Sequence, residues 1–319
     1  MQSKRERKRQ RRIIAILLII AAALFVGLFV LFFVDRSNTN RSVALRAGDA
    51  GVQIYQAKKW QDFVIKGLNL SLGSRAPLSK AEYGRFFKRL ASLDYNVIRI
   101  DTLFPPAFYQ ALFEYNILTS KPLYLLQGIH LDGEAVKKYR NAYDPNLNTG
   151  FINGIKLTID AIHGNAGPKQ ADEHGAGKYN LNAAPFVLGF NFLVDEGSGD
   201  FVITTNGKNT DVMGFEGNFL YTESATPYEA WLAGMGNFAI VYEQGKYGGP
   251  NRLVSWMGWN ETDPLAQLAK ADQDSDESDK KSENPAAVHI EHIRSTEKFA
   301  AGILSTRQLR EKFTNYNEL

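Results

Sequence analysis

Two adjacent carboxylates, Asp195 and Glu196, stand at the end of the apolar run VLGFNFLV. A run of this length and composition predicts a buried parallel strand, and α/β barrels place their catalytic groups at the carboxyl ends of such strands. Apolar neighbours raise the pKa of a carboxyl group, which would suit Glu196 to act as a general acid. The opposing interpretation is an ordinary surface turn, because DEGSGD, residues 195–200, has the composition of one.

An arginine and a histidine accompany two other predicted strands. Arg99 lies within NVIRI, where burying an unpaired charge would be costly. It therefore either orients the carboxylates of a site or forms a structural ion pair with Asp101. His130 follows the apolar run PLYLLQGI and is either a ligand-binding side chain or a packing group.

The segment VSWMGWNETDPL contributes aromatic rings and one more carboxylate. Trp256 and Trp259 either stack on the face of a sugar ring or belong to an ordinary core. Glu261 is the nearest candidate for a second carboxylate across a cleft from Glu196. Two carboxyl groups across one bond, one protonated and one ionised, are what glycoside hydrolysis needs.

The elements that must position these residues alternate between strands and helices, which indicates right-handed βαβ units and a parallel sheet. The helix KAEYGRFFKRLASL is expected to begin at a Ser79 cap with Glu82 three residues on, and another helix is expected over residues 226–248. The expected strands are FVIKGLNL, NVIRIDTL, KPLYLLQGIHLD, VLGFNFLVDE, RLVSWMGW and AAVHIEHI, and STEKFAAGILSTRQLREKFTNYNEL is expected to be helical or frayed.

The amino-terminal part of the chain predicts a membrane anchor. Residues 13–34 are 22 uncharged residues, roughly 33 Å as a helix against a hydrocarbon core of about 30 Å. The basic tail 1–12 places that end in the cytoplasm, so a single-pass cell-membrane protein with an extracytoplasmic domain is expected. A cleavable signal peptide would have a shorter apolar region and a small-residue cleavage site. Residues 35–51 are expected to form a tether and 52–319 the folded domain.

Composition excludes several classes of function. The net charge is +3, but residues 1–12 contribute +6, so the rest sums to 3 − 6 = −3, which argues against a nucleic-acid partner. The chain has no cysteine, and His289 and His292 lack a third ligand, so no metal or cofactor is expected. The charged segment 270–285 is expected to be a disordered loop, and it lacks the glycine and terminal glutamate of a calcium loop. The GxSxG, P-loop, GxGxxG and HExxH motifs are all missing.

From about residue 63 to residue 302 the chain resembles the (β/α)8-barrel catalytic domains of clan A glycoside hydrolases, in particular the family 2-type barrels of membrane-anchored bacterial proteins. The resemblance is carried, in order, by FVIKGLNL, NVIRI, PPAFYQALFEYN, PLYLLQGIHLD, AIHGNA, GAGKYN, VLGFNFLVDE and VSWMGWNETDPL. It implies a TIM-type barrel of which this chain holds about six of the eight strands, so that it looks like a truncated member.

The resemblance also implies roles for individual residues. Glu196 matches the acid/base position on strand four, with Asp195 as its near alternative, and Arg99 matches an arginine that orients the carboxylates. His130 and Trp259 would line sugar subsites. The family's nucleophile belongs to a seventh strand that is not recognised in this chain, so retaining hydrolase activity is not expected. A polysaccharide-acting enzyme and a non-catalytic carbohydrate-binding or scaffold protein of the cell envelope both remain open.

Overall fold

The structure, a computed structural model, describes residues 45–48, 51–56, 59–72, 77–167, 175–194, 198–249, 252–264 and 284–307, together with residues 14, 17, 22 and 24. The chain divides into two compact units, Met1–Arg41 and Ser42–Leu319. Within the described residues, no helix is both long and apolar enough to cross a membrane. Most of the segment 13–34 lies outside those residues, so the anchor stays a prediction.

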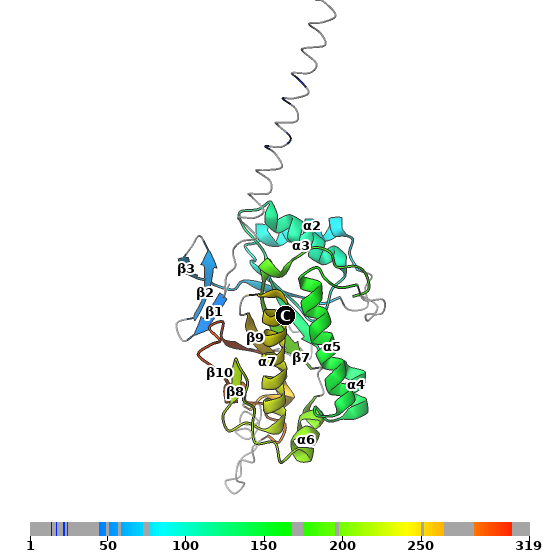
Figure 1. Cartoon of the computed structure of the whole chain (residues 1–319), viewed down its shortest axis with the longest axis vertical. Coiled ribbons are helices and arrows are strands. Elements are labelled where there is room, and N and C mark those ends of the chain that lie inside the picture. The colour runs from blue at the N-terminus through cyan, green and yellow to red at the C-terminus, as the bar shows by residue number, and fades with distance from the viewer. Residues whose placement is uncertain are drawn as a thin grey trace, which may run out of the picture. The chain divides into compact units, whose positions relative to one another are not determined.

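The second unit is an α/β domain (Figure 1). Its strands are β1 Leu45–Gly48, β2 Gly51–Gln56, β3 Lys59–Asp62, β4 Gly67–Leu70, β5 Val97–Ile100, β6 Tyr124–His130, β7 Val187–Leu193, β8 Leu220–Thr222, β9 Leu253–Gly258, β10 Ile293–Ser295 and β11 Ile303–Arg307. Its helices are α2 Lys80–Ser92, α3 Pro106–Ile117, α4 Gly133–Tyr139, α5 Pro145–Ile162, α6 Gly199–Lys208 and α7 Pro227–Tyr247.

The main sheet has six strands in the order β11-β9-β7-β6-β5-β4, and every neighbouring pair is parallel. The strands are added strictly in chain order. Crossovers between parallel strands are right-handed as a rule, and with this order the rule keeps the connecting helices on one face, as in a barrel. Figure 1 shows α5 and α7 lying alongside β7 and β9.

The sheet is curled into a half-barrel. Arg99 of β5 lies within 3.4 Å of the sulfur of Met257 on β9, although two strands separate β5 from β9. In a flat sheet those two strands would be about 14 Å apart, at roughly 4.8 Å per strand, which is farther than an arginine side chain reaches. The contact therefore requires a curled sheet with both side chains on its concave face.

Two hydrophobic clusters separate the faces of the sheet. Ile98, Phe190 and Val254 belong to the large cluster formed with the helices. Val97 and Leu253 instead pack with Leu45 and Ile54 of the antiparallel meander β1-β2-β3, together with Leu188. Since Val97 and Leu253 are the first residues of their strands, the meander covers the amino-terminal half of the concave face and leaves the carboxyl half uncovered by it.

Helix boundaries follow the capping residues that the sequence predicts. Ser79 accepts a hydrogen bond from the backbone of Glu82, whose carboxylate accepts in return from the Ser79 backbone. Thr226 and Glu229 form the same capping box at the start of α7, and Gly248, at φ +61°, ends that helix. Reciprocal caps and a left-handed glycine fix both ends of a helix locally, which is why these predictions are confirmed.

The sixth parallel strand differs from the prediction. AAVHIEHI was expected to supply it, but this segment forms a short 3-10 turn leading into β10, which pairs antiparallel with β8 in a separate sheet. The sixth strand is β11, within the segment expected to be helical or frayed. Gly302, at φ +85°, turns the chain immediately before β11 and packs against Ala47. The tertiary pairing of β11 with β9 thus overrides local propensity. Strand β1 also lies inside the segment expected to be a tether.

A buried ion cluster ties the amino-terminal end of the sheet to the ends of two helices. The Glu243 carboxylate on α7 accepts hydrogen bonds from the Arg252 guanidinium at 2.7 and 2.9 Å and lies 2.7 Å from His163 at the end of α5. Arg252 also donates to the carbonyl oxygen of Val187, the first residue of β7. Burial alone would raise the pKa of Glu243, but Arg252 and His163 outweigh it and hold the pKa below its usual range.

Replacing Glu243 with alanine should leave the buried Arg252 without its carboxylate. We expect the free energy of unfolding to fall by about 3–5 kcal/mol, the usual cost of breaking a buried ion pair from one side. Denaturant unfolding measures this loss. The control is Glu114→Ala, which removes an exposed pair with Lys80 and should cost no more than about 1 kcal/mol. Equal losses of unfolding free energy in the two variants would contradict the idea that the Glu243 cluster stabilises this end of the sheet.

The same cluster predicts how stability depends on pH. Because folding lowers the pKa of Glu243 below its ordinary value of 4.5, its contribution is complete above that pH and is lost as the pH falls toward the folded pKa. We expect the free energy of unfolding to decline on acidification below pH 4.5, and the decline to be shallower in Glu243→Gln. Parallel pH curves for the two proteins would show that other carboxylates dominate.

Candidate functional site

The uncovered half of the concave face carries a row of polar side chains. Register and side-chain contacts place one on each of the six strands of the sheet: Asn69 of β4, Arg99 of β5, His130 of β6, Asn191 of β7, Ser255 of β9 and Thr306 of β11. Barrel interiors are usually filled by Val, Ile and Leu. A polar row at the carboxyl ends of parallel strands therefore indicates a binding surface rather than a packed core.

Arg99 is the cationic centre of this row. Its Nε donates to Asn69 at 3.1 Å, and its terminal nitrogens lie 3.4 Å from the Met257 sulfur and from an Asp101 oxygen. The side chains of Arg99 and Asp101 are 17% and 30% exposed, so solvent still reaches the pair. A thioether is a weak acceptor and the carboxylate contact is long, so the guanidinium retains capacity for another acceptor.

Burial changes the proton affinity of both members of the pair. It lowers the pKa of Arg99, and the neighbouring Asp101 carboxylate opposes that shift. Burial raises the pKa of Asp101, and the charges of Arg99 and His130 oppose it. The structural ion pair considered from the sequence is thus present, and it lies beside His130, as a predicted site would require.

The other end of the row centres on Asn191. Its side-chain oxygen accepts hydrogen bonds from the Ser255 hydroxyl at 2.7 Å and the Thr306 hydroxyl at 3.0 Å. Its side-chain nitrogen is buried and has no hydrogen-bond partner among the described residues. A buried amide with unused donors is uncommon in folded proteins and marks a place where a polar group from elsewhere would be stabilising.

Two glycines keep the middle of the concave face open. A Cβ at Gly128 of β6 would collide with the carbonyl oxygens of Ile100 and Asp101, and one at Gly189 of β7 would collide with the carbonyl oxygen of Leu253. No other residue fits at either position without displacing a neighbouring strand. The absence of side chains there also gives Arg99 a free path across the face to Met257.

The predicted acids Asp195 and Glu196 lie outside the described residues, but the residues on either side of them are held in place. The indole nitrogen of Trp259 donates to the carbonyl oxygen of Val194 at 2.6 Å. The Glu261 carboxylate accepts from the backbone nitrogen of Ser198 at 2.6 Å. The loop after β9 therefore brackets the segment 195–197, and the described partner of Glu261 is the start of α6.

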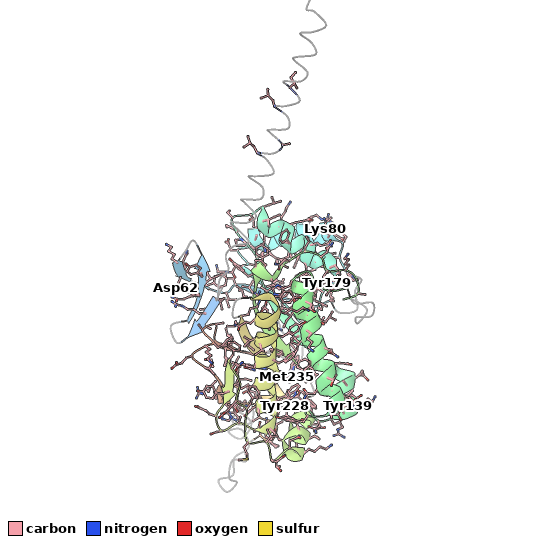
Figure 2. All side chains as sticks on the ribbon, in the orientation of Figure 1. Asp62, Lys80, Tyr139, Tyr179, Tyr228 and Met235 are labelled. Atoms are coloured by element: carbon pink, nitrogen blue, oxygen red, sulfur yellow. The ribbon has the colours of Figure 1, made fainter. Side chains whose placement is uncertain are left out.

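Trp256 lies on the opposite face of the sheet. It is buried, stacks on Phe192 at 6.3 Å and packs against Gly236 of α7. With Trp231, Tyr228 and other residues it lines a cavity of about 50 Å³ beside α7, where Tyr228 and Met235 are labelled in Figure 2. Val194, Trp259 and Glu291 line the same cavity, which therefore reaches the carboxyl ends of β7 and β9. The contacts with Phe192 and Gly236 assign Trp256 to the helix-side core.

The predicted site residues thus fall into three groups. Arg99 and His130 flank Asp101 on the concave face, Trp259 and Glu261 hold the ends of the segment 195–197, and Trp256 is packed under a helix. No group of three or more His, Asp or Glu side chains in the described part of the chain could hold a metal. No protein-family model, curated protein or solved structure matches this chain.

Sequence reasoning missed the polar row as a unit. The members that the sequence analysis did not single out are Asn69, Asn191, Ser255 and Thr306, and the last of these lies in a strand that was not predicted. A signal was present, because Asn191 and Ser255 are single polar residues inside otherwise apolar strands. Period-2 alternation would have placed them on the face opposite the helices.

Removing the Arg99 charge tests the electrostatics of the site. In Arg99→Met the opposing cation is lost while burial remains, so the pKa of Asp101 should rise further above its ordinary value. Carboxyl NMR titration of Asp101 measures the change. The exposed arginine Arg46, which contacts Gln53 and the Trp60 ring, provides the matched variant Arg46→Met. An Asp101 titration that is unchanged in Arg99→Met would disprove the coupling.

Proposed function

We propose that this protein binds a carbohydrate on the polar half of its concave face and is held at the outer face of a cell membrane by residues 13–34. The observation that carries the binding proposal is the row of polar side chains where a barrel interior is normally apolar. Hydroxyl-rich ligands suit such a row, because each hydroxyl both donates and accepts. The resemblance to clan A glycoside hydrolases points to the same ligand class.

Binding is favoured over hydrolysis because the carboxylates of Asp101 and Glu261 are both engaged within the domain. Asp101 is paired with Arg99, and Glu261 holds the backbone of Ser198. Neither stands as a free partner for a glycosidic acid. The parallel half-barrel, with its carboxyl ends uncovered by the meander, supports a glycoside-hydrolase-like scaffold that retains the sugar-facing surface.

Hydrolysis is the second candidate, and one arrangement favours it. Trp259 bonds to Val194 and Glu261 bonds to Ser198, the described residues on either side of residues 195–197. Hydrogen bonds at flanking residues are the kind of support that a catalytic acid requires. In this alternative Glu196 is the general acid, with Asp195 as the neighbouring candidate.

The test measures retention of the detergent-solubilised full chain on immobilised neutral and acidic cell-envelope polysaccharides. We expect binding by the unaltered chain and about tenfold weaker binding by Arg99→Met, equivalent to about 1.4 kcal/mol for one charged hydrogen bond. Arg46→Met, which changes an arginine of the meander, should bind normally. Equal weakening in both variants, or no binding by the unaltered chain, would contradict the proposal.

The same preparation distinguishes the second candidate. Release of nitrophenol from nitrophenyl glycosides by the unaltered chain, abolished in Glu196→Gln, would establish hydrolysis in place of simple binding. Retention on a polysaccharide with no release would favour the carbohydrate-binding protein.

A further inference from the structure

Exposed apolar side chains gather at the end of the sheet opposite the polar row. The described part of the second unit exposes eight large apolar side chains, and four of them lie in three loops that precede β4, β5 and β6. These four, which we call the basal patch, are Val64, Ile65, Leu93 and Leu118. Single exposed apolar residues are ordinary, but a cluster of them marks a contact surface.

Hydrogen bonds show that the three loops are neighbours. The Asn96 side chain donates to the carbonyl oxygen of Val64 and accepts from the backbone nitrogen of Lys66, both at 2.8 Å. Between the loop that precedes β6 and the loop that precedes β5, the Lys121 ammonium lies 3.1 Å from the Asp94 carboxylate. The loop 64–66 is thereby tied to 94–96, and 94–96 to the loop after Leu118.

The positions of the two leucines follow from the helices that they end. Leu93 is the carboxyl cap of α2 and Leu118 is that of α3, and the two helices pack side by side. Leu93 is 54% exposed and Leu118 is 85% exposed. Burial within the domain therefore contributes little to the stability of either side chain.

Basic side chains accompany the basal patch. Lys66, Arg89 and Lys121 lie within four residues of its members, as do the acids Asp62, Asp94 and Glu114, so the local charge is 3 − 3 = 0. The rest of the chain after residue 12 is net acidic. Apolar tips interleaved with Lys and Arg are the composition of surfaces that lie in a lipid headgroup layer.

The chain length places a membrane within reach of this end of the domain. Ten residues, 35–44, separate the proposed anchor from Leu45, and they extend at most roughly 36 Å. Leu45 packs with Val97 and Phe63, which adjoin the loops of the basal patch. A short tether of this kind gives an effective concentration in the millimolar range, so even a weak surface would be occupied.

We propose that the basal patch docks on the surface of the membrane, with its apolar side chains in the headgroup layer and its cations against anionic lipids. This inference rests on the proposed anchor. A second copy is the competing occupant, and the membrane is favoured over it because the short tether holds the domain near the bilayer at a high effective concentration. Docking at this end directs the carboxyl ends of the strands, and the polar row, away from the bilayer.

The absence of cysteine from the chain makes a site-specific test direct. The full chain carrying Leu118→Cys, labelled with an environment-sensitive fluorophore, is reconstituted into vesicles of phosphatidylcholine and phosphatidylglycerol that contain nitroxide lipids. The matched control is Met213→Cys, since Met213 is 87% exposed and lies in the loop after α6. We expect a blue shift and several-fold greater quenching at position 118 than at position 213.

A second pair of variants separates docking from labelling artefacts. A label at Leu93→Cys should be quenched in the same way, and adding Val64→Asp and Leu118→Asp should abolish that quenching. Replacing phosphatidylglycerol with phosphatidylcholine should reduce it. All of these positions are exposed, and thermal unfolding of each variant verifies that the fold is retained.

Vesicle flotation distinguishes failure of the docking from failure of the anchor. A chain that floats with vesicles but shows equal quenching at positions 118 and 213 keeps its anchor and overturns the docking. A chain that does not float overturns both. A spectral shift at position 118 that depends on protein density and not on nitroxide lipid would identify a second copy as the occupant and overturn membrane docking.

Discussion

The curl of the parallel sheet is the constraint on which the rest of the domain depends. It brings Arg99 of β5 against Met257 of β9, although β6 and β7 lie between these two strands. One face of the sheet is therefore a concave surface. That surface is divided along the strand direction. The meander and its apolar partners fill the amino-terminal half, whereas Asn69, Arg99 and Asn191 occupy the other.

Two glycines also shape the concave surface. Gly128 and Gly189 lie where the backbone of the neighbouring strands leaves no space for a Cβ. The two groups of buried charges lie at opposite ends of the sheet. The Glu243 cluster, in which Glu243 and Arg252 are buried, clamps the amino-terminal end of the sheet, and the Arg99 pair is partly exposed at the carboxyl end.

Local signals in the sequence predicted most of the scaffold. Reciprocal caps at Ser79 and Thr226 and the apolar runs of five strands specify their own structure, because the required contacts lie within a few residues. The sixth strand was misplaced because β11 is chosen by pairing with β9, some fifty residues earlier in the chain. The sequence could single out Arg99, Asp101 and His130 because each is a polar residue inside or just after an apolar strand. The hydrogen-bonded unit of Asn191, Ser255 and Thr306 was not, because it depends on the register of three strands.

The contact between Ala47 and Ala301 has a consequence for the order of folding. Strand β1 is synthesised before any other described strand of the domain, yet its backbone nitrogen at Ala47 donates to the carbonyl oxygen of Ala301, just before the last described strand. The strands between them can pair one after another as the chain emerges, since each joins its predecessor. The meander, however, lacks its hydrogen bond from Ala47 until residue 301 has been made. Strand β1 and the residues before β11 therefore become native together, because this hydrogen bond can form only after residue 301 has been synthesised.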